Sequence, residues 1–580
     1  MKLTTKYTIV FLTLIAAQTA IAQKKGENIG TEVVNVVKPY TPTISDAFKV
    51  KETPALEDED NTAKENITYN IFSFPVASTF TPSKGKAANV DRTKQAQLYK
   101  NFATFGIGNY GTINAELFVT EEVGDNSYVA GMFRNLSSQG GIKDLFLDDK
   151  YNNTSLDLTF GSKGDIAYTI DLGYQNQGYN WYGIPKDFGE NLVTEDRNQI
   201  INSIDSQQSY HNLYVGSNVI FNESIFSDVS LKYNRFWDAY GSQENRFFVK
   251  PNFSIDINDT KIKTEVIADY VGGSFEKGYE FADKITYGYA NFGIRPSFNM
   301  VRDDWSIDFG AAVFYSFDLE DTDGKIFIYP SINASYKVVG DLMVFYAGAE
   351  GTLQQNSYRD FTNENPFVSP TLNVGPTDRQ YDIFAGLKGK LASSVSYNLR
   401  ASYMNERGKA MFRSNPYNLD PTNEEYAFGN SFGVVYDDVK TISGFGEIKA
   451  DFSKNVSFGL SATFNSYSVD KQDQPWNLPV FNVTSSLDVN LTEKWYAGAD
   501  VFVVGERKDL RDDSIINASD SFVTLGSYFD ANAHIGYKHN ERLTGFLKFN
   551  NIANQSYQKW LDYQVQGFQV VIGASYKFDF

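Results

Sequence analysis

The chain ends in Phe568-Gln569-Val570-Val571-Ile572-Gly573-Ala574-Ser575-Tyr576-Lys577-Phe578-Asp579-Phe580, with an apolar residue at every even-numbered position. Successive side chains of a β-strand point to opposite faces, so this stretch has one apolar and one more polar face. The pattern fits the closing strand of a membrane β-barrel, which we expect over residues 560–580. It also fits the edge strand of a soluble sandwich. The rest of the chain decides between these two environments.

The composition favours an all-β envelope protein. The 580 residues include 37 Tyr and 46 Phe but no Cys, and no long stretch has the apolar period of an amphipathic helix. The absence of cysteine excludes disulfides, thiolate catalysis and cysteine metal ligands. The formal net charge of −19 opposes binding to nucleic acid, so we expect no nucleic-acid partner.

The N-terminus has the pattern of an export signal. Lys2 and Lys6 precede an apolar run at 7–17, and the small residues that a signal peptidase recognises follow at 20–22. We predict that residues 1–22 are a signal peptide, cleaved after Ala22. No later segment is apolar and long enough for a membrane helix. The exported chain is therefore expected to be periplasmic, secreted or an outer-membrane barrel.

From residue 102 onward, segments of about ten to fifteen residues alternate between apolar and polar positions, as barrel strands do. In 455–465, for example, Val456, Phe458 and Leu460 share one face and Ser457, Gly459 and Ser461 the other. One face accepts charges and the opposite face does not. A charge facing lipid at mid-bilayer costs about 2–4 kcal/mol, whereas a charge facing a wet lumen costs little. This asymmetry predicts lipid on the apolar face.

The connections give a second test, because a barrel should have short turns at one end and long loops at the other. Short polar turns recur at 162–164, 222–224, 258–260, 302–304, 339–341, 392–394, 453–455, 492–494 and 539–541. Longer stretches rich in Gly, Asn and Asp lie at 138–151, 184–208, 277–286, 357–379, 409–429, 470–475 and 508–521. With 430–453 taken as one long strand, the count is about 22. We predict a transmembrane antiparallel β-barrel over residues 101–580, after an irregular extension, in the periplasm or the lumen, over 23–100.

Aromatic residues are expected near the strand ends, where membrane barrels carry interfacial girdles. The candidates are Trp181, Tyr182, Phe236, Trp237, Tyr240, Trp476, Trp495 and Trp560.

The last strands resemble those of TonB-dependent outer-membrane receptors. The resemblance rests on Asn550-Asn551-Ile552-Ala553-Asn554-Gln555-Ser556-Tyr557, Gly567-Phe568, Ala574-Ser575-Tyr576-Lys577-Phe578 and Val435-Tyr436-Asp437-Asp438, and covers roughly residues 100–580. It implies a 22-stranded barrel in the outer membrane of a Gram-negative cell, with lipid and the barrel-assembly machinery as partners. Tyr576, Phe578 and Phe580 would form the assembly signal. The Asn-rich and aromatic-rich style is similar to that of Bacteroidetes-type envelope proteins.

The chain departs from that family at its N-terminus. Only about 75 residues separate the cleavage site from the barrel, too few for the plug domain of such receptors by ordinary domain size. We therefore expect a barrel without a full plug, which puts coupling to TonB in doubt. An open 22-stranded barrel would leak. The extension, folded loops or a partner must occlude it.

Three motifs suggest other chemistry. Gly106–Gly111 matches G-x-G-x-x-G, but an alternating strand follows in place of the required helix, so we predict a hairpin tip. The carboxylates of Asp318, Glu320, Asp321 and Asp323 could bind Ca²⁺, although they lack the distal Glu of an EF-hand loop and a solvated turn is favoured. His211 is a candidate base for an outer-membrane enzyme, and a lone structural histidine on a strand is the expected interpretation.

The leading hypothesis is a receptor-type outer-membrane barrel that mediates uptake or capture of a solute. Polar lumen residues would act on the solute without bond chemistry, so we expect no enzyme activity and no cofactor apart from the Ca²⁺ candidate. Candidate lumen residues are Arg400, Asn465, Asp500 and Lys548. The alternative is a plugless barrel that serves as a subunit of an export or assembly complex, with a surface or periplasmic lipoprotein as its partner.

Overall fold

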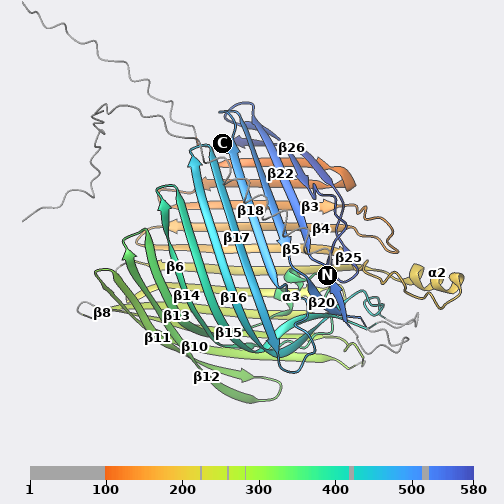
Figure 1. Cartoon of the computed structure of the whole chain (residues 1–580), viewed down its shortest axis with the longest axis horizontal. Coiled ribbons are helices and arrows are strands. Elements are labelled where there is room, and N and C mark those ends of the chain that lie inside the picture. The colour runs from red at the N-terminus through yellow and green to blue at the C-terminus, as the bar shows by residue number, and fades with distance from the viewer. Residues whose placement is uncertain (1–97, 223–224, 258–259, 281–282, 417–423, 512–521) are drawn as a thin grey trace, which may run out of the picture. The chain divides into compact units, whose positions relative to one another are not determined.

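The computed structural model describes residues 98–580 except 223–224, 258–259, 281–282, 417–423 and 512–521. The predicted signal peptide (1–22) and nearly all of the predicted extension (23–100) lie outside the described residues. The described chain forms one antiparallel sheet of 22 strands, each paired with the next along the chain (Figure 1). The last strand, β26 (Gln569–Phe578), pairs with the first, β1 (Asn101–Gly108). This pairing closes the sheet and leaves no free edge. The prediction of an all-β barrel of about 22 strands is confirmed.

The barrel strands between β1 and β26 are β2 (Ile113–Glu122), β3 (Ser127–Ser138), β4 (Tyr151–Lys163), β5 (Ile166–Asn180), β6 (Gln207–Phe221), β7 (Phe226–Asp238), β8 (Gln243–Ile257), β9 (Thr260–Phe275), β10 (Ile285–Arg302), β11 (Trp305–Asp318), β12 (Asp323–Val339), β13 (Met343–Gln354), β14 (Thr377–Ala392), β15 (Val395–Ser414), β16 (Phe432–Ser453), β17 (Val456–Val469), β18 (Phe481–Asn490), β19 (Trp495–Val504), β22 (Tyr528–Lys538) and β23 (Leu543–Asn550). The connections carry the short hairpins β20 (Arg507–Leu510) with β21 (Phe522–Leu525) and β24 (Gln558–Trp560) with β25 (Tyr563–Gln564). They also carry the helices η2 (Asn109–Gly111), α2 (Thr194–Ser203) and α3 (Tyr358–Glu364).

The connections fall alternately at the two ends of the barrel because neighbouring strands run in opposite directions. One end, which also holds Asn101 and Phe578, has only short turns, and we call it the turn end. Seven of the predicted short turns coincide with connections at this end, and the other two, 222–224 and 258–260, fall partly outside the described residues. The opposite end, the loop end, carries all the long connections, such as 181–206, 355–376 and 551–568. The predicted alternation of turns and loops is therefore confirmed.

The long strand predicted over 430–453 is observed as β16, but its neighbour β15 is longer than expected. β15 continues to Ser414, whereas the sequence suggested a loop from residue 409. The β15–β16 register shifts between Glu406 and Lys409, and Gly408 there has φ +59°. A glycine in this left-handed region fits a β-bulge. The polar Gly-Lys step is thus an irregularity inside a strand and not the start of a loop.

The apolar face of the strands points away from the lumen, as predicted. Phe105, Phe464 and Ile572, from three different strands, are 57%, 57% and 58% exposed on the outside of the isolated barrel. Their neighbour Val571, on the opposite face, is 6% exposed. A ring of exposed apolar side chains is what a hydrocarbon environment requires. Among the described residues, no helix is long and apolar enough to cross a membrane.

Two expectations about the positions of aromatic residues were wrong or incomplete. Trp560 is not part of the closing strand but lies in β24, within the last loop. Several of the expected girdle aromatics are interior residues: Trp181, Phe236, Trp476 and Trp560 are 0%, 2%, 2% and 7% exposed. The loop end has its own protein core, and aromatic residues at that end pack into it. The glycine motif at 106–111 forms the hairpin tip between β1 and β2, as predicted.

Candidate functional site

One connection crosses the barrel mouth. Residues 355–376, which we call the crossing loop, leave β13, form α3 and return as β14. The crossing loop meets β6, where the Tyr210 hydroxyl donates to the Pro366 carbonyl at 2.8 Å. It also meets the last loop, where the rings of Phe367 and Tyr563 stack with centroids 3.6 Å apart. The last loop comprises residues 551–568, between β23 and β26. Because β6 and this loop lie far from β13 in opposite directions around the ring of strands, the crossing loop reaches both only by spanning the lumen.

Local sequence explains the shape of the crossing loop. The Ser357 side chain accepts a hydrogen bond from the Asp360 backbone N–H, which caps the first turn of α3. After the helix, the Asn365 side chain accepts from the Phe367 backbone N–H. The Asn356 amide donates to the Gly375 carbonyl at 2.8 Å and to the Thr377 hydroxyl at 2.9 Å, which ties the two ends of the loop together.

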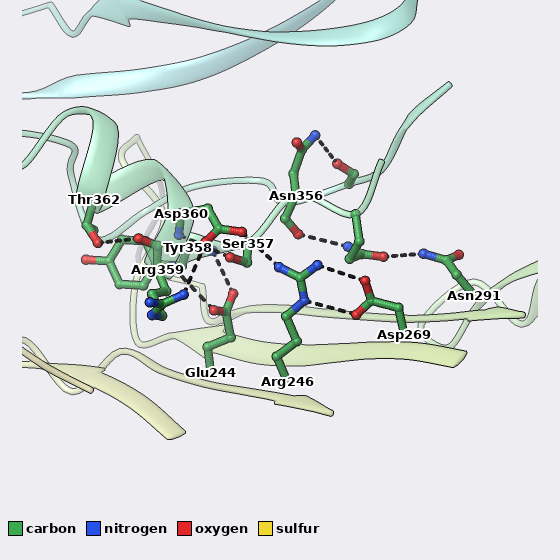
Figure 2. Close-up of polar contacts among 12 residues, drawn as sticks. Glu244, Arg246, Asp269, Asn291, Asn356, Ser357, Tyr358, Arg359, Asp360 and Thr362 are labelled. Carbon is green, nitrogen blue, oxygen red and sulfur yellow. Dashed lines mark hydrogen bonds and ion pairs between the residues drawn. The ribbon is translucent and has the colours of Figure 1, made fainter. Parts of the chain in front are cut away.

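A buried carboxylate fastens α3 to the wall (Figure 2). Glu244 of β8 is 2% exposed. Its Oε2 accepts hydrogen bonds from the Tyr358 backbone N–H at 2.6 Å and the Tyr287 hydroxyl at 2.7 Å, and its Oε1 accepts from the Arg359 N–H at 3.3 Å. The Tyr358 hydroxyl donates to Asp238 at 2.8 Å. These hydrogen bonds supply partners for the polar groups of α3 and of the wall, so they hold the helix in a defined position.

A partly buried arginine adds a second anchor beside the first (Figure 2). Arg246 of β8 holds Asp269 of β9 in two hydrogen bonds, Nε–Oδ1 at 2.9 Å and Nη2–Oδ2 at 2.7 Å. Its remaining Nη1 donates to Asp360 of α3 at 2.8 Å. Bidentate pairs of this kind are among the strongest charge-assisted hydrogen bonds. The guanidinium therefore links two barrel strands to the crossing loop.

An apolar cluster, which we call the mouth core, fills the space around the crossing loop. Its buried members come from strands β6, β7, β9, β10, β15 and β16 and from loops 181–206, 355–376, 415–431, 505–527 and 551–568. Tyr563 packs against Phe367, and its hydroxyl donates to the Asn430 carbonyl at 2.5 Å. Trp560 packs on Phe412 with ring centroids 5.3 Å apart. The mouth is thus occupied by a packed core where an empty barrel would hold water.

The mouth core leaves two adjoining cavities along one wall. The upper cavity, about 410 Å³, lies among the crossing loop, the last loop and the loop-end parts of β4, β5 and β22. The lower cavity, about 720 Å³, is lined by β2–β5, β23, β26 and the α3 residues Arg359 and Asn363. Four residues line both cavities: Tyr151, Asn363, Asn550 and Gln569. The two cavities therefore adjoin along the edge of α3, and Asn550 lies directly opposite Gln569 in the sheet.

Partial desolvation shifts the pKa of two side chains that line the upper cavity and keep contact with solvent. It lowers the pKa of the Lys559 amine, with nearby Arg507 acting in the same direction. It raises the pKa of the Glu364 carboxyl, against the opposing effect of Lys409 and Lys559. Both shifts favour the uncharged form. The lower cavity differs, since Glu116, Arg134, Arg359 and Lys548 line it.

Of the four predicted lumen residues, only Lys548 lines one of these cavities. Arg400 lies on the opposite face from exposed Leu399, is paired with Asp382 at 2.7 Å, and holds its guanidinium 3.9 Å from the Phe384 ring centroid. Asn465 and Asp500 likewise lie opposite exposed neighbours. Their roles in handling a solute stay predictions.

The sequence did not indicate the residues that line both cavities. Asn550 and Gln569 lie in the two strands before the C-terminus, and strand alternation combined with their pairing could have placed them on the polar wall. Asn363 offered no such signal, since it comes from a loop whose path depends on contacts with distant strands.

The acidic residues 318–323 form a turn. Asp318 Oδ1 accepts from the backbone N–H of Glu320 at 3.0 Å and of Asp321 at 3.3 Å, as turn-forming aspartates do. Glu320 accepts from the Thr286 hydroxyl at 2.8 Å, and Asp323 lies 3.7 Å from the Lys325 amine. Within the described ranges, no group of three or more His, Asp or Glu is arranged to hold a metal ion. The Ca²⁺ candidate at these residues stays a prediction.

The remaining singled-out residues lie on the outer surface. His211 is on the same face of β6 as exposed Leu213, stacked against Trp237 with centroids 5.2 Å apart and hydrogen-bonded to the Tyr174 hydroxyl at 2.8 Å. It is therefore remote from both cavities. At the turn end, Tyr576 and Phe580 are 44% and 85% exposed, and Phe578 stacks on Tyr576. Their role as an assembly signal stays a prediction.

Comparison with known proteins identifies the fold. No model of a known family matches the sequence, and no curated protein matches it. Among solved structures, the ferripyoverdine receptor of the outer membrane of Pseudomonas aeruginosa aligns with a TM-score of 0.60 and 13% identity, over 84% of this chain and 73% of that one. The FrpB iron transporter from Neisseria meningitidis gives 0.60 and 10%, over 83% and 82%. The copper transporter OprC gives 0.57 and 12%, over 84% and 82%. The chain shares the barrel fold of these proteins, in agreement with the resemblance to TonB-dependent receptors.

Proposed function

We propose that this protein is an outer-membrane barrel that captures a solute at its loop end and passes it along the adjoining cavities into the lumen. One observation carries the proposal: the crossing loop and the mouth core fill the mouth but leave two adjoining cavities, lined by polar and aromatic side chains, along the wall made by β2–β5 and the last strands. The fold, shared with receptors and transporters, is consistent with this role.

The path makes the crossing loop the selective element. The mouth core blocks water and unrelated solutes over most of the opening. At the edge of α3, Asn363 lines both cavities and can contact a solute that enters them. The anchors at Glu244 and Arg246 hold this edge in place. In this proposal the crossing loop takes over part of the occluding task of a plug, so a barrel without a full plug can stay closed to bulk flow.

Channel recordings test the proposal. The full chain is reconstituted in planar bilayers, together with a variant in which residues 357–365 are replaced by Gly and Ser. We expect low conductance for the wild type and a several-fold increase for the variant, because the loop crosses the lumen. Equal, negligible conductance for both would contradict the proposal and favour the scaffold subunit of an export or assembly complex.

Thiol labelling provides a second test, because the chain contains no cysteine and each introduced thiol is unique. Asn363→Cys should react with a small polar reagent added from the loop side. The attached label should then lower the residual conductance of the barrel. Ser402→Cys, on the polar wall but outside both cavities, is the control. Faster labelling at Ser402 than at Asn363 would contradict the proposed path.

A further inference from the structure

The outer face of β5, β6 and β7 changes its chemistry towards the loop end. Its apolar part includes Leu172, Leu213 and Leu231, which are 45%, 40% and 37% exposed. Beyond these residues, the same face carries a group of polar and aromatic side chains, which we call the interface cluster: Tyr174, Asn176, Ser209, His211, Arg235 and Trp237. The interface cluster adjoins the lipid-facing wall and lines neither the upper nor the lower cavity.

Three aromatic rings of the interface cluster form a ladder across these three strands. His211 lies between Tyr174, with ring centroids 6.2 Å apart, and Trp237, with centroids 5.2 Å apart. Its Nδ1 lies 2.8 Å from the Tyr174 hydroxyl, and its Nε2 lies 2.8 Å from the Ser209 hydroxyl. Because both ring nitrogens have partners, the imidazole is held nearly parallel to the indole, with 11° between the planes. The ladder is a fixed amphipathic surface of the kind that suits the boundary between hydrocarbon and headgroups.

The positive charge of the interface cluster has no counter-charge beside it. The Arg235 guanidinium donates to the Gln243 side-chain oxygen and has no carboxylate partner among the described residues. Along the described strands β5, β6 and β7, the outer-face positions hold no Asp or Glu, although the whole chain has a formal net charge of −19. A guanidinium at the edge of an apolar wall needs an anionic or aqueous partner, because hydrocarbon cannot solvate it. Arg235 can therefore take a counter-charge from outside the chain.

A second outer-face cation shows that this arrangement is local. Lys440 of β16 also lies one outer-face position beyond an exposed apolar residue, Ile442, which is 62% exposed. Asp438, a carboxylate, lies two residues away in the same strand. The residues directly opposite Lys440 in the neighbouring strands, Asn405 and Ser468, are not aromatic. Lys440 thus differs from Arg235 in both respects and serves as a matched control.

We propose that the interface cluster binds the headgroup of an anionic phospholipid in the membrane leaflet next to the loop end. A guanidinium matches the phosphate oxygens in a bidentate geometry, so Arg235 recognises the charge. The ring ladder packs against the uncharged part of the headgroup, and the acyl chains continue along the apolar wall that begins at Leu213. This continuity with the lipid-facing wall favours a lipid over a free anion, which would not contact the wall. The site lies outside the barrel and is independent of the proposed capture path.

Lipid binding is measured by native mass spectrometry of the full chain released from detergent micelles. The chain is titrated with phosphatidylglycerol, whose headgroup is anionic, and with phosphatidylcholine of the same acyl chains, whose headgroup has no net charge. We expect one phosphatidylglycerol to bind per barrel about fivefold more tightly than phosphatidylcholine, the effect of one cation at an anionic membrane surface. Inorganic phosphate is the third probe, and we expect that it does not displace the bound lipid.

Matched variants locate the site. Arg235→Gln should remove the preference for phosphatidylglycerol, whereas Lys440→Gln removes an outer-face cation elsewhere and should leave the preference unchanged. Trp237→Leu removes one end of the ring ladder and should weaken the binding of both lipids, because the ladder packs against headgroup atoms that carry no charge. Altered migration on unheated gels reports whether each variant folds, and Tyr174→Leu replaces Trp237→Leu if that variant does not fold.

Four outcomes would overturn the inference. They are equal binding of the two lipids to the wild type, an unchanged preference in Arg235→Gln, an equal loss of preference in Lys440→Gln, and displacement of the lipid by inorganic phosphate. The last outcome would identify a site for the free ion in place of a lipid site.

Discussion

The two ends of the barrel place aromatic side chains in different surroundings. At the turn end, Trp495 is 43% exposed on the outer face and packs against Tyr537, and Trp305 is 50% exposed and stacks on Tyr336. At the loop end, Trp476 and Trp560 are 2% and 7% exposed within protein cores. The outer face of the turn end relies on lipid to cover its apolar groups, whereas the loop end covers them with its own loops. The second arrangement closes the mouth and creates the cavities.

The largest expected effect comes from breaking the anchor of the crossing loop. Arg246→Met leaves Asp269, whose side chain is 10% exposed, without its partner. Loss of one member of a buried ion pair costs about 3–5 kcal/mol, so we expect the crossing loop to detach and the conductance to rise. Arg400→Met is the control, because the pair of Arg400 with Asp382 lies on the polar wall outside both cavities. Equal conductance of the two variants would count against the anchor.

A pair of tryptophan variants sharpens the contrast between the two ends. Trp476→Ala removes a buried ring and should cost about 3–5 kcal/mol in the free energy of unfolding. Trp495→Ala removes a ring from the lipid-facing side, where no protein cavity forms, and should cost less. Urea unfolding in lipid vesicles measures both. A greater loss for Trp495→Ala would reverse the interpretation of the two ends.

The lipid-facing wall can be tested with a charge on each side of one strand. Leu399 is 51% exposed on the outer face of β15. Leu399→Arg should lower the stability of the folded barrel by about 2–4 kcal/mol if the residue faces the bilayer centre. Ser402→Arg places the same charge on the opposite face, where Arg400 is already accepted. Similar stability of both variants in vesicles would argue that lipid does not cover the apolar wall.

The smallest effect is a pH dependence at the loop end. Asp509 of β20 is fully buried and accepts from the Ser414 N–H and the Asn477 amide, each at 2.8 Å. Burial raises its pKa to about 6, against the opposing effect of these hydrogen bonds. Because the folded pKa exceeds the unfolded value, docking of the β20–β21 hairpin is strongest below that unfolded value and weakens as the pH rises through about 6.

Between pH 5 and pH 7 the loss should be roughly 1 kcal/mol. Hydrogen exchange of the β20–β21 amides, corrected for the intrinsic pH dependence of exchange, measures it. Asp509→Asn keeps an acceptor for Ser414 and should remove the pH dependence. A variant that retains the same pH dependence as the wild type would show that another group is responsible.

Much of the barrel was predictable from the sequence, and the successes share a cause. Strand alternation, as in 455–465, and the spacing of polar turns depend on neighbours along the chain, and both predicted the closed sheet correctly. The errors also share a cause. The Gly408 bulge and the burial of Trp181 and Trp476 depend on the partner strand or loop that each residue meets.

For the candidate site the sequence was a weaker guide. Arg400, Asn465 and Asp500 were chosen because a polar wall accepts them, but three-dimensional packing decides which part of that wall stays open. Lys548 lies at a cavity because the crossing loop leaves that side uncovered. Neither the loop's path nor its anchors at Glu244 and Arg246 has a periodic signature.

The order of residues was enough to specify that strands of period two alternate with short turns and long loops, because side-chain alternation and turn chemistry act between near neighbours. It thereby determined the barrel and which wall faces lipid. Three-dimensional packing was needed to establish that residues 355–376 cross the mouth, that five loops and six strands share one core, and that Asn363 stands between two cavities. These features arise from contacts between segments more than a hundred residues apart, and packing, unlike periodicity, is specified only when all the partners are in place.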